Sequence, residues 1–258
     1  MGEKKCIFSL EGKTSVVTGG ARGIGKVVAL EMANAGSNIA IVDMLEDVAT
    51  ETAKEIEKKH GVKAKGYKCD VTDPAQVNAV IDEIASDFGA LDVLFNNAGI
   101  VLHKPALDVT PDEWLNVINV NLNGVFFVAQ AFAKNLVKNK RPGSIINTAS
   151  MSGTIVNIPQ PQASYNASKA AVIHLTKSLA IELAPHEIRV NSISPGYIET
   201  EMTAQVRKDW VEEWLKLSPT KRMGKPEELA GMVVLLAGDS SKFTNGSDII
   251  MDGAFTCV

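Results

Sequence analysis

The chain has 258 residues, of which 45% are hydrophobic and 22% are charged, a composition that is ordinary for a globular protein with one large core. The formal net charge is −4 and no long block of Lys or Arg occurs, which argues against nucleic-acid binding and against binding to an anionic membrane. The three cysteines lie far apart and show no metal-ligand spacing. We therefore expect free thiols, no metal site and a cytoplasmic location.

The N-terminus and the apolar runs support the same expectation. Residues 1–10 are too few and too polar for a signal sequence. No apolar run approaches the roughly 18 residues that cross a bilayer. Because no linker, low-complexity tract or internal repeat interrupts the sequence, it predicts one domain over residues 1–258.

Short apolar stretches alternate with longer helical patterns along the chain. The expected strands are residues 14–18, 38–43, 62–71, 91–99, 143–150, 188–196 and 247–253. The helical patterns between them include one that ends at Gly61, one that begins at Pro74 and a long one over about 111–138. Alternation of this kind predicts βαβ units, and strands that are apolar throughout indicate a sheet covered on both faces. The expected fold class is α/β, with a seven-stranded parallel sheet and helices on both faces.

The segment from Tyr197 to Lys225 breaks this alternation after the sixth expected strand. Within it, residues 207–217 form an amphipathic pattern whose apolar members share one helix face: Trp210, Val211, Trp214, Leu215 and Leu217. One interpretation is a surface helix that packs on the core or on another subunit. The other is a substrate lid over about 197–225, because open α/β sheets bind ligands beyond the carboxyl ends of their strands.

A glycine-rich turn follows the first expected strand. The turn has the sequence TGGARGIG, residues 18–25, and its glycines Gly19, Gly23 and Gly25 lie between a strand and a helix. Glycine there lets the backbone approach a phosphate closely, and the N-terminus of the helix favours an anion. Asp43 ends the next strand, where a carboxylate accepts hydrogen bonds from a ribose and repels a 2′-phosphate. The alternative for Asp43 is a helix cap or a solvated turn residue. The pattern predicts NAD, with NADP less favoured.

Two further clusters fall at the same edge of the predicted sheet. The sequence NNAG, residues 96–99, follows the fourth expected strand, and Asn and Gly are also common turn residues. Asp70 follows the third expected strand, where it either meets an adenine amino group or caps the helix at Pro74. The residues of these turns that we expect to contact the dinucleotide are Arg22, Ile24, Asp70, Val71, Asn97, Ala98 and Gly99.

The reactive groups are expected on and before a helix of small residues. Tyr165 and Lys169 stand four residues apart and so share one helix face, where the lysine cation would favour the phenolate and lower the pKa of the tyrosine. Ser150 ends the preceding strand and would hydrogen-bond the substrate oxygen. The alternative is a tyrosine packed on the sheet beside an unrelated surface lysine. In NVNLNG, residues 119–124, Asn121 indicates either a local kink that frees a carbonyl to bind water or ordinary polar helix positions.

In this order, TGxxxGxG, D-V, NNAG, the Asn-containing helix, Ser, YxxxK and SPGYIET resemble the short-chain dehydrogenases/reductases over nearly the whole chain. The resemblance implies a Rossmann-type doubly wound fold, a nicotinamide cofactor and a catalytic tetrad of Asn121, Ser150, Tyr165 and Lys169. The resemblance implies that Lys169 also holds the nicotinamide ribose. It implies that Asn121, through a water molecule, helps Lys169 to relay protons. It adds these cofactor contacts: Pro195, Gly196, Ile198 and Thr200. It further implies a homotetramer, with helices around 111–138 and 163–184 at one interface and the C-terminal segment at another.

Two positions depart from the family pattern. The catalytic serine usually precedes the tyrosine by about thirteen residues, whereas Ser150 precedes Tyr165 by fifteen and Ser152 fits by count. We choose Ser150 because it ends the strand directly after IINTA, where the motif places it. The terminal DGG of many members reads DGA here, with Ala254, which concerns packing rather than chemistry.

The loop between Ser150 and Lys169 most resembles members that act on sugar alcohols and ketoses. It carries Asn157, Gln160 and Gln162, whose amides can hydrogen-bond several hydroxyls, as a polyol site requires. His103 is a further polar candidate, or else a surface residue. The expected substrate contacts are Ser150, Ser152, Asn157, Gln160, Tyr165 and Trp210.

These patterns predict hydride transfer between NAD(H) and a secondary alcohol or ketone, with a polyol/ketose pair as the expected substrates. The first alternative is NADPH-dependent reduction of a 3-oxoacyl thioester, which Asp43 disfavours although Arg22 would partly offset its charge. The second alternative is a catalytically inactive relative that senses the dinucleotide and binds a partner protein. That protein would have no need of the full set of reactive residues.

Overall fold

The structure is a computed structural model, and it describes residues 6–258. Residues 1–5, part of the stretch on which the signal-sequence expectation rests, lie outside the described residues. Seven parallel strands form one sheet in the order β3-β2-β1-β4-β5-β6-β7. The strands are β1 (Thr14–Thr18), β2 (Asn38–Asp43), β3 (Ala64–Lys68), β4 (Val93–Asn96), β5 (Gly143–Thr148), β6 (Ile188–Pro195) and β7 (Asp248–Met251). The predicted fold class, a doubly wound α/β domain, is confirmed.

The strand order reverses between β1 and β4, which are neighbours in the sheet. Successive connections leave these two strands in opposite directions, and a ligand crevice opens beyond their carboxyl ends in sheets of this kind. The residues that follow β1, β4 and β5 therefore face one region of the molecule. Most of the predicted cofactor and catalytic residues belong to these segments.

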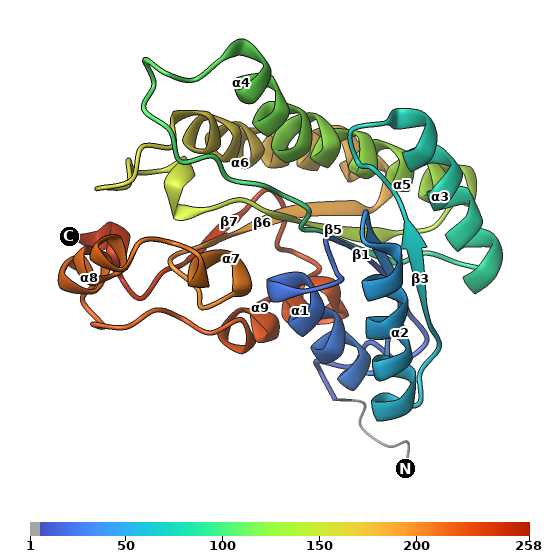
Figure 1. The fold of residues 1–258 in the computed structure, drawn as a ribbon. Helices are drawn as coiled ribbons and strands as arrows, with labels where there is room; N and C mark the ends of the chain where they lie inside the picture. The colour runs from blue at the N-terminus through green and yellow to red at the C-terminus, as the bar shows by residue number, and fades with distance from the viewer. Residues whose placement is uncertain (1–5) are drawn as a thin grey trace.

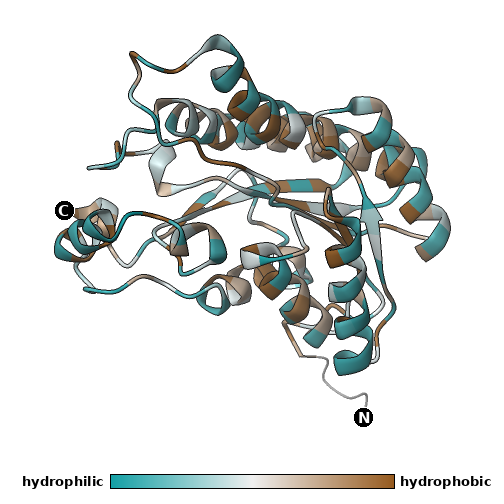
Figure 2. Ribbon diagram, viewed as in Figure 1, coloured by the Kyte–Doolittle hydropathy of each residue, from teal (hydrophilic) through white to brown (hydrophobic). Residues whose placement is uncertain are grey.

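Helices cover both faces of the sheet, as Figure 1 shows. The longer helices are α1 (Gly23–Asn34), α2 (Glu46–His60), α3 (Pro74–Phe88), α4 (Pro111–Ile118), α5 (Val125–Lys138), α6 (Ala163–Leu183), α8 (Lys208–Leu217) and α9 (Glu227–Ala237). Residues of α1, α2 and α9 share one buried cluster with the sheet, and residues of α3, α5 and α6 share another. Hydrophobic residues accordingly concentrate in the strands and on the helix faces that pack on them (Figure 2).

Several strands are shorter than the sequence predicts. β4 ends at Asn96, whereas the apolar pattern continued to residue 99. Asn96 pairs with Thr18 of β1 and with Asn147 of β5. Because β1 ends at Thr18, the chain after Asn96 loses that partner and forms a loop instead. The same shortening of β3 and β5 leaves residues 69–71 and 149–150 as loop residues at the carboxyl edge.

Local signals explain where the helices begin and end. Pro74 is the first residue of α3, as predicted, and the Asp73 carboxylate caps the helix by accepting from the N–H groups of Ala75 at 2.8 Å and Gln76 at 3.2 Å. The interpretation of Asp70 as that cap is therefore wrong. Gly61 ends α2 with a φ of 69°, a left-handed conformation that glycine adopts without steric cost.

The predicted long helix over 111–138 is continuous, with a π-helical turn, η1 (Asn119–Gly124), between α4 and α5. One window of it has a mean hydropathy of 1.3, so Pro111–Lys138 could cross a membrane by length and composition, contrary to the expectation from apolar runs. This criterion is weak, because the core helices of water-soluble proteins also meet it. Here 44% of the window is buried, and Val128, Phe132 and Leu136 of α5 belong to the core under the sheet.

The position of a large apolar side chain, inside or outside the core, predicts how much its removal lowers the free energy of unfolding. Phe132 is fully buried and Leu107 is 100% exposed. We expect Phe132→Ala to lower the free energy of unfolding by about 3–5 kcal/mol, because it leaves a cavity against the sheet. Leu107→Ala is the control, with a change below about 0.5 kcal/mol. Urea unfolding at one protein concentration measures both, and equal losses would contradict the described core.

Candidate active site

The glycine-rich turn brings β1 into close contact with the segment after β4. A Cβ atom on Gly19 would lie 2.9 Å from the Cα of Ala98, and one on Gly25 would lie 2.1 Å from the carbonyl oxygen of Gly19. Gly19 and Gly23 also have positive φ angles, 62° and 56°. Side chains are thus excluded at Gly19 and Gly25. The helix α1 begins after Arg22, which provides no side-chain cap, so its first N–H groups remain available to a phosphate.

Asp43 lies beside this turn at the end of β2. One carboxylate oxygen accepts from the N–H of Ala21 at 3.1 Å, and the other accepts from the N–H of Leu45 at 3.1 Å. Leu45 itself occupies the N-cap position of α2, so Asp43 does not cap that helix. The structure therefore places a carboxylate against the glycine turn, which is compatible with the predicted ribose contact.

Asn97 joins the ends of three strands. Its backbone N–H donates to the hydroxyl of Thr18 at 2.9 Å, and its side-chain amide donates to the carbonyl of Gly19 at 3.2 Å. Its side-chain carbonyl accepts from the hydroxyl of Thr148 at 3.3 Å. The NNAG segment thus holds β1 and β5 at a defined spacing beside the glycine turn.

The third turn of this edge is built by Asp70 and Val71. The Asp70 carboxylate accepts from the N–H and the hydroxyl of Thr72, at 2.9 and 2.7 Å, and so closes a local turn. Val71 packs on η1, where a Cβ on Gly124 would lie 2.8 Å from it. Both residues lie at the expected edge, and their contact with adenine stays a prediction.

Lys169 and Tyr165 share one face of α6, as the spacing predicts. The ammonium nitrogen of Lys169 lies 5.6 Å from the centre of the Tyr165 ring and donates to the carbonyl of Thr148 at 2.6 Å. Lys169 is 3% exposed. The side chain of Ser150 forms a hydrogen bond with that of Tyr165. The structure thus brings phenol, hydroxyl and ammonium together at the carboxyl end of β5.

Asn121 completes this group from η1. It is fully buried, its side-chain carbonyl accepts from the N–H of Ile100 at 2.8 Å, and its amide donates to the carbonyl of Ile100 at 2.9 Å. A Cβ on Gly99 would lie 3.3 Å from the Asn121 oxygen, which is a tight contact, and 3.6 Å from the Lys169 nitrogen, which is an ordinary one, so the backbone at Gly99 lies directly beside both groups. The π-helical turn is the local irregularity that the three asparagines predicted.

The pKa of Tyr165 differs from the value that the sequence predicts. Burial lowers the pKa of Lys169 to about 8, and no carboxylate of the described residues forms an ion pair with it. Burial raises the pKa of Tyr165, and the hydrogen bond from Ser150 opposes that rise only in part. The expected lowering of the tyrosine pKa by the lysine is therefore wrong for the protein by itself, because desolvation of the buried phenol is the largest contribution and the opposing contribution comes from Ser150.

Ser150 and Ser152 have different partners. The Ser150 hydroxyl caps a short helical turn, Met151–Gly153, by accepting from the N–H of Ser152 at 3.1 Å. The Ser152 hydroxyl accepts instead from the amide of Gln162 at 3.2 Å. The hydrogen bond to Tyr165 belongs to Ser150, which supports the choice made from the motif.

The amides of the following loop form a buried cluster around Tyr197. Asn157 and Gln160 are each 3% exposed, and both donate to the Tyr197 hydroxyl at 3.0 Å. The Asn157 carbonyl accepts from Gln162 at 3.2 Å, and the Gln160 carbonyl accepts from the indole of Trp214 at 2.8 Å. These side chains were expected to contact a substrate directly. In the structure their polar atoms already bind one another and the segment after β6.

The segment 197–225 folds over this cluster as two helices, α7 (Glu201–Ala204) and α8. Of the five apolar residues expected on one face of α8, only Trp214 is buried, and Leu217 is 38% exposed. Trp210 contacts His103 edge to face, with ring centres 5.3 Å apart. Burial lowers the pKa of His103, which also hydrogen-bonds Gln162. Tyr197 and Trp214 were not singled out as site residues, although Tyr197 follows the predicted Pro195-Gly196 pair directly.

The remaining predicted residues lie at the start of the same segment. Gly196 packs on the segment after β7, since a Cβ there would lie 2.7 Å from the Cα of Asp252. Ile198 is buried and pairs with Gly224. Thr200 caps α7 and, together with Glu201, lies within 4.0 Å of a Cβ placed on Gly23. The segment after β6 therefore begins directly beside the glycine turn.

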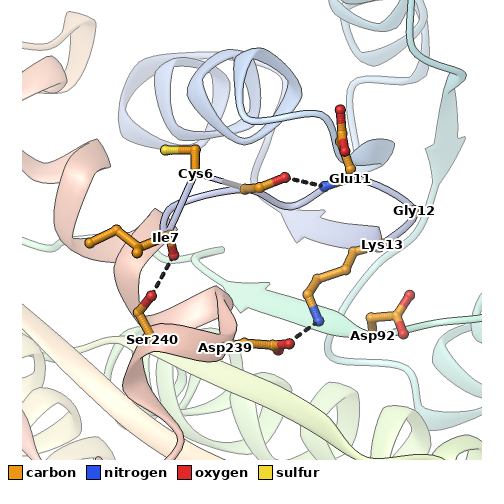
Figure 3. A pocket seen from close by; sticks show the side chains of 9 residues that line it. Cys6, Ile7, Glu11, Gly12, Lys13, Asp92, Asp239 and Ser240 are labelled. Atoms are coloured by element: carbon orange, nitrogen blue, oxygen red, sulfur yellow. Dashed lines mark hydrogen bonds and ion pairs between the residues drawn. The ribbon is translucent and has the colours of Figure 1, made fainter. Parts of the chain in front are cut away.

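Two pockets lie apart from the reactive group. One of about 450 Å³ opens at the amino ends of β1 and β4, where Lys13 forms an ion pair with Asp239 at 3.1 Å (Figure 3). It lies at the opposite edge of the sheet from Tyr165. Another of about 400 Å³ lies between α7 and α8. Within residues 6–258, no group of three or more His, Cys, Asp or Glu side chains is arranged to hold a metal ion.

Known proteins resemble this chain over almost its whole length. Residues 19–256 match the family model described as enoyl-(acyl carrier protein) reductase. The sorbose reductase of Candida albicans is 47% identical over 97% of this chain and 89% of that protein. The galactitol 2-dehydrogenase of Rhizobium johnstonii is 42% identical over 97% of each. The probable NADP-dependent mannitol dehydrogenase of Yarrowia lipolytica is 45% identical over 97% of this chain and 90% of that protein.

Solved structures agree with these relatives. A short-chain type dehydrogenase/reductase from Mycobacterium marinum superimposes with a TM-score of 0.95 at 46% identity, covering 98% of each chain. A gluconate 5-dehydrogenase from Burkholderia cenocepacia, solved in complex with NADP and tartrate, has a TM-score of 0.92 at 37% identity over 98% of each chain.

The buried ammonium predicts a pH dependence of stability. The pKa of Lys169 is about 8 in the folded protein and about 10.4 in the unfolded chain, so the unfolded chain binds more protons between these values and stability rises with pH. Relative to Lys169→Met, the wild-type free energy of unfolding should rise by about 2 kcal/mol from about pH 7.5 to about pH 10. Urea unfolding at each pH measures this. Lys177→Met, at an exposed position of α6, is the control, and a flat difference for Lys169→Met would contradict the buried charge.

Proposed function

The chain belongs to the short-chain dehydrogenase/reductase family, and on this premise we propose that it transfers a hydride between NAD(H) and a sugar alcohol or its ketose. The observation that carries the substrate class is the buried row of amides, Asn157, Gln160 and Gln162, beside Ser150 and Tyr165. These amides bind one another and the Tyr197 hydroxyl, so they form a polar wall beside the reactive group, and a substrate with several hydroxyls suits such a wall better than an apolar one. The names of the relatives, which include sorbose, galactitol and mannitol enzymes, support the same class.

We assign the proton transfer to Tyr165. Burial raises the pKa of its phenol, so at neutral pH it holds a proton that it can donate to the oxygen of a ketone during reduction. Ser150, hydrogen-bonded to Tyr165, orients that oxygen. The Lys169 ammonium faces the ring and stabilises the phenolate that remains after donation. Asn121 acts as a positioning residue that fixes the backbone of Ile100 beside Lys169.

The glycine turn and its neighbours fit a dinucleotide. A backbone without side chains at Gly19 and Gly25, followed by an uncapped helix N-terminus, suits a pyrophosphate. When bound, the nicotinamide supplies or accepts the hydride. We assign its binding to the turn residues already described, with Asn97, Ala98 and Gly99 at the centre, Lys169 on the ribose, and Pro195, Gly196, Ile198 and Thr200 along the nicotinamide side.

We further propose NAD(H) rather than NADP(H). The Asp43 carboxylate, which faces the glycine turn, would accept from the ribose hydroxyls and would repel a 2′-phosphate. Arg22 is exposed at the start of α1 and would offset this charge only in part. Two relatives are named as NADP-dependent mannitol dehydrogenases and a third as a probable one, which counts against this choice and makes cofactor preference a direct test.

Three broader features belong to the proposal. Residues 197–225 serve as a lid over the substrate, supported by the contacts of Tyr197 and Trp214 with the amide cluster. The protein forms a homotetramer, supported by the exposed apolar side chains of Leu115 on α4, Ile181 on α6 and Val258 at the C-terminus. It acts in the cytoplasm, supported by free cysteines at positions 6, 69 and 257.

A second candidate is reduction of a 3-oxoacyl thioester with NADPH. The description of the matching family model, which names an acyl carrier protein, favours it. The polar amide cluster counts against it, because an acyl chain would have to pack beside a polar wall formed by Asn157, Gln160 and Tyr197. A catalytically inactive sensor is less favoured still, since Tyr165, Ser150 and Lys169 lie together in the arrangement that acid–base chemistry needs.

Replacement of the proton donor tests the proposed chemistry. We expect Tyr165→Phe to lower kcat for ketose reduction by at least about 10²–10⁴-fold, because the phenol supplies the proton in the transition state. The dissociation constant for NADH should change little. Tyr67→Phe is the matched control. It also removes a buried phenol hydroxyl, in this case one on β3 that donates to Asp87 of α3. Turnover and cofactor binding are followed by NADH absorbance and fluorescence, and retained turnover in Tyr165→Phe would contradict the assignment.

Cofactor preference tests the role of Asp43. Wild-type kcat/KM should favour NADH over NADPH, and Asp43→Asn should raise kcat/KM for NADPH by about tenfold or more because it removes the repelling charge. Asp47→Asn, in the first turn of α2, is the control for a lost carboxylate nearby. A wild-type preference for NADPH, or no shift in Asp43→Asn, would refute the NAD assignment.

A further inference from the structure

Hydrogen bonds that meet at Ser152, whose N–H and hydroxyl each take part in one, link the reactive group to the lid. They run from the Ser150 hydroxyl through the N–H of Ser152, the hydroxyl of Ser152 and the amide of Gln162 to Asn157, with distances of 3.1–3.2 Å. Asn157 then donates to the Tyr197 hydroxyl at 3.0 Å. Tyr197 therefore stands at the end of a polar path that begins at the group expected to hold the substrate oxygen.

The direction of the bonds at Tyr197 follows from Trp214. The indole N–H of Trp214 can only donate, so the atom of Gln160 that faces it must be the carbonyl oxygen. The other end of the same amide is then the NH₂ group, which donates to the Tyr197 hydroxyl at 3.0 Å. Since Asn157 also donates there, the Tyr197 oxygen accepts two hydrogen bonds.

Both lone pairs of the Tyr197 oxygen are thus used, and its own proton is left to donate. Within residues 6–258, no acceptor receives that proton. Burial raises the pKa of Tyr197, while the bonds from Gln160 and Asn157 oppose this, and the hydroxyl stays protonated at neutral pH. A half-buried hydroxyl with an unused proton is a ready donor to an oxygen that enters the site.

Packing holds the Tyr197 ring in place. The ring stacks on Trp214 with centres 3.9 Å apart and planes within 7°, and Phe255 contacts it edge to face at 5.3 Å. Tyr197 also follows Gly196 at the end of β6, where Gly196 packs closely on the segment after β7. The donor is therefore presented from a rigid backbone and a rigid ring, which lowers the cost of forming a further hydrogen bond.

We propose that Tyr197 is a specificity-determining residue whose hydroxyl donates a hydrogen bond to a substrate hydroxyl away from the reacting carbon. The inference rests on the proposed polyol/ketose function and adds to it a contact that separates polyhydroxylated ketones from plain ones. A ketone without such a hydroxyl leaves the Tyr197 proton without a partner, whereas a ketose satisfies it.

The test compares fructose and sorbose with 2-hexanone, a six-carbon ketone without hydroxyls, in the full-length enzyme with NADH. Tyr197→Phe should lower kcat/KM for the ketoses by about 10–100-fold, mainly through KM. It should leave kcat/KM for 2-hexanone and the dissociation constant for NADH within about twofold. Thermal melting confirms that the variant folds.

Trp214→Phe tests the direction of the bonds at Tyr197. It keeps an aromatic ring against Tyr197 but removes the indole donor to Gln160, so the Gln160 amide is free to turn and accept the Tyr197 proton. We expect it to lower kcat/KM for the ketoses, by less than Tyr197→Phe does, and to leave kcat/KM for 2-hexanone within about twofold. If Tyr197→Phe also lowers activity on ketoses and 2-hexanone equally, or lowers kcat for ketoses with KM unchanged, Tyr197 is only a packing residue of the lid and the inference fails.

The same experiment separates this failure from failure of the proposed function. If the wild-type enzyme reduces ketoses and Tyr197→Phe reduces them equally well, only the role of Tyr197 is wrong. If the wild-type enzyme reduces 2-hexanone or an acetoacetyl thioester but no ketose or polyol partner, the proposed substrate class is wrong and the role of Tyr197 falls with it.

Discussion

The site depends on one ammonium group that is buried without an ion-pair partner among the described residues. Lys169 donates to a single backbone carbonyl, that of Thr148 at 2.6 Å, and burial lowers its pKa to about 8. A cation held in this way is costly to fold around, because desolvation disfavours its charge. The protein retains it beside the phenol of Tyr165, at the carboxyl end of β5, where Ser150 follows the strand.

Several segments of the chain surround Lys169 and hold its neighbours in place. Gly99 lies where a Cβ would come within 3.6 Å of the ammonium nitrogen, and the π-helical turn brings the buried Asn121 to the same place. Asn97 ties the ends of β1 and β5 together behind it. These features come from three separate segments of the chain, and they meet because the strand order of the sheet brings their carboxyl ends side by side.

A second polar layer connects this centre to the segment after β6. Its members are amides that bind one another, which gives the substrate side of the site a fixed shape before any substrate enters. Tyr197 and Trp214 stack on each other and belong to this layer through three hydrogen bonds with Asn157 and Gln160. Chemistry and recognition are therefore carried by different layers, the first built on β5 and α6 and the second shared between the loop before α6 and the lid.

Local sequence determined a large part of this protein. The alternation of apolar strands with helical patterns predicted the parallel sheet, because residue periodicity and β-branched composition act over a few residues. The spacing of Tyr165 and Lys169 placed them on one helix face for the same reason. Tertiary structure alone decided the rest: β4 stops at Asn96 because its partner β1 turns away, Asp73 rather than Asp70 caps α3, and burial raises the pKa of Tyr165 although Lys169 lies beside its ring. It also brought Tyr197 and Trp214 to the amides of the loop, since contacts between residues 37–54 positions apart depend on how the whole chain packs and leave no periodic trace in the sequence.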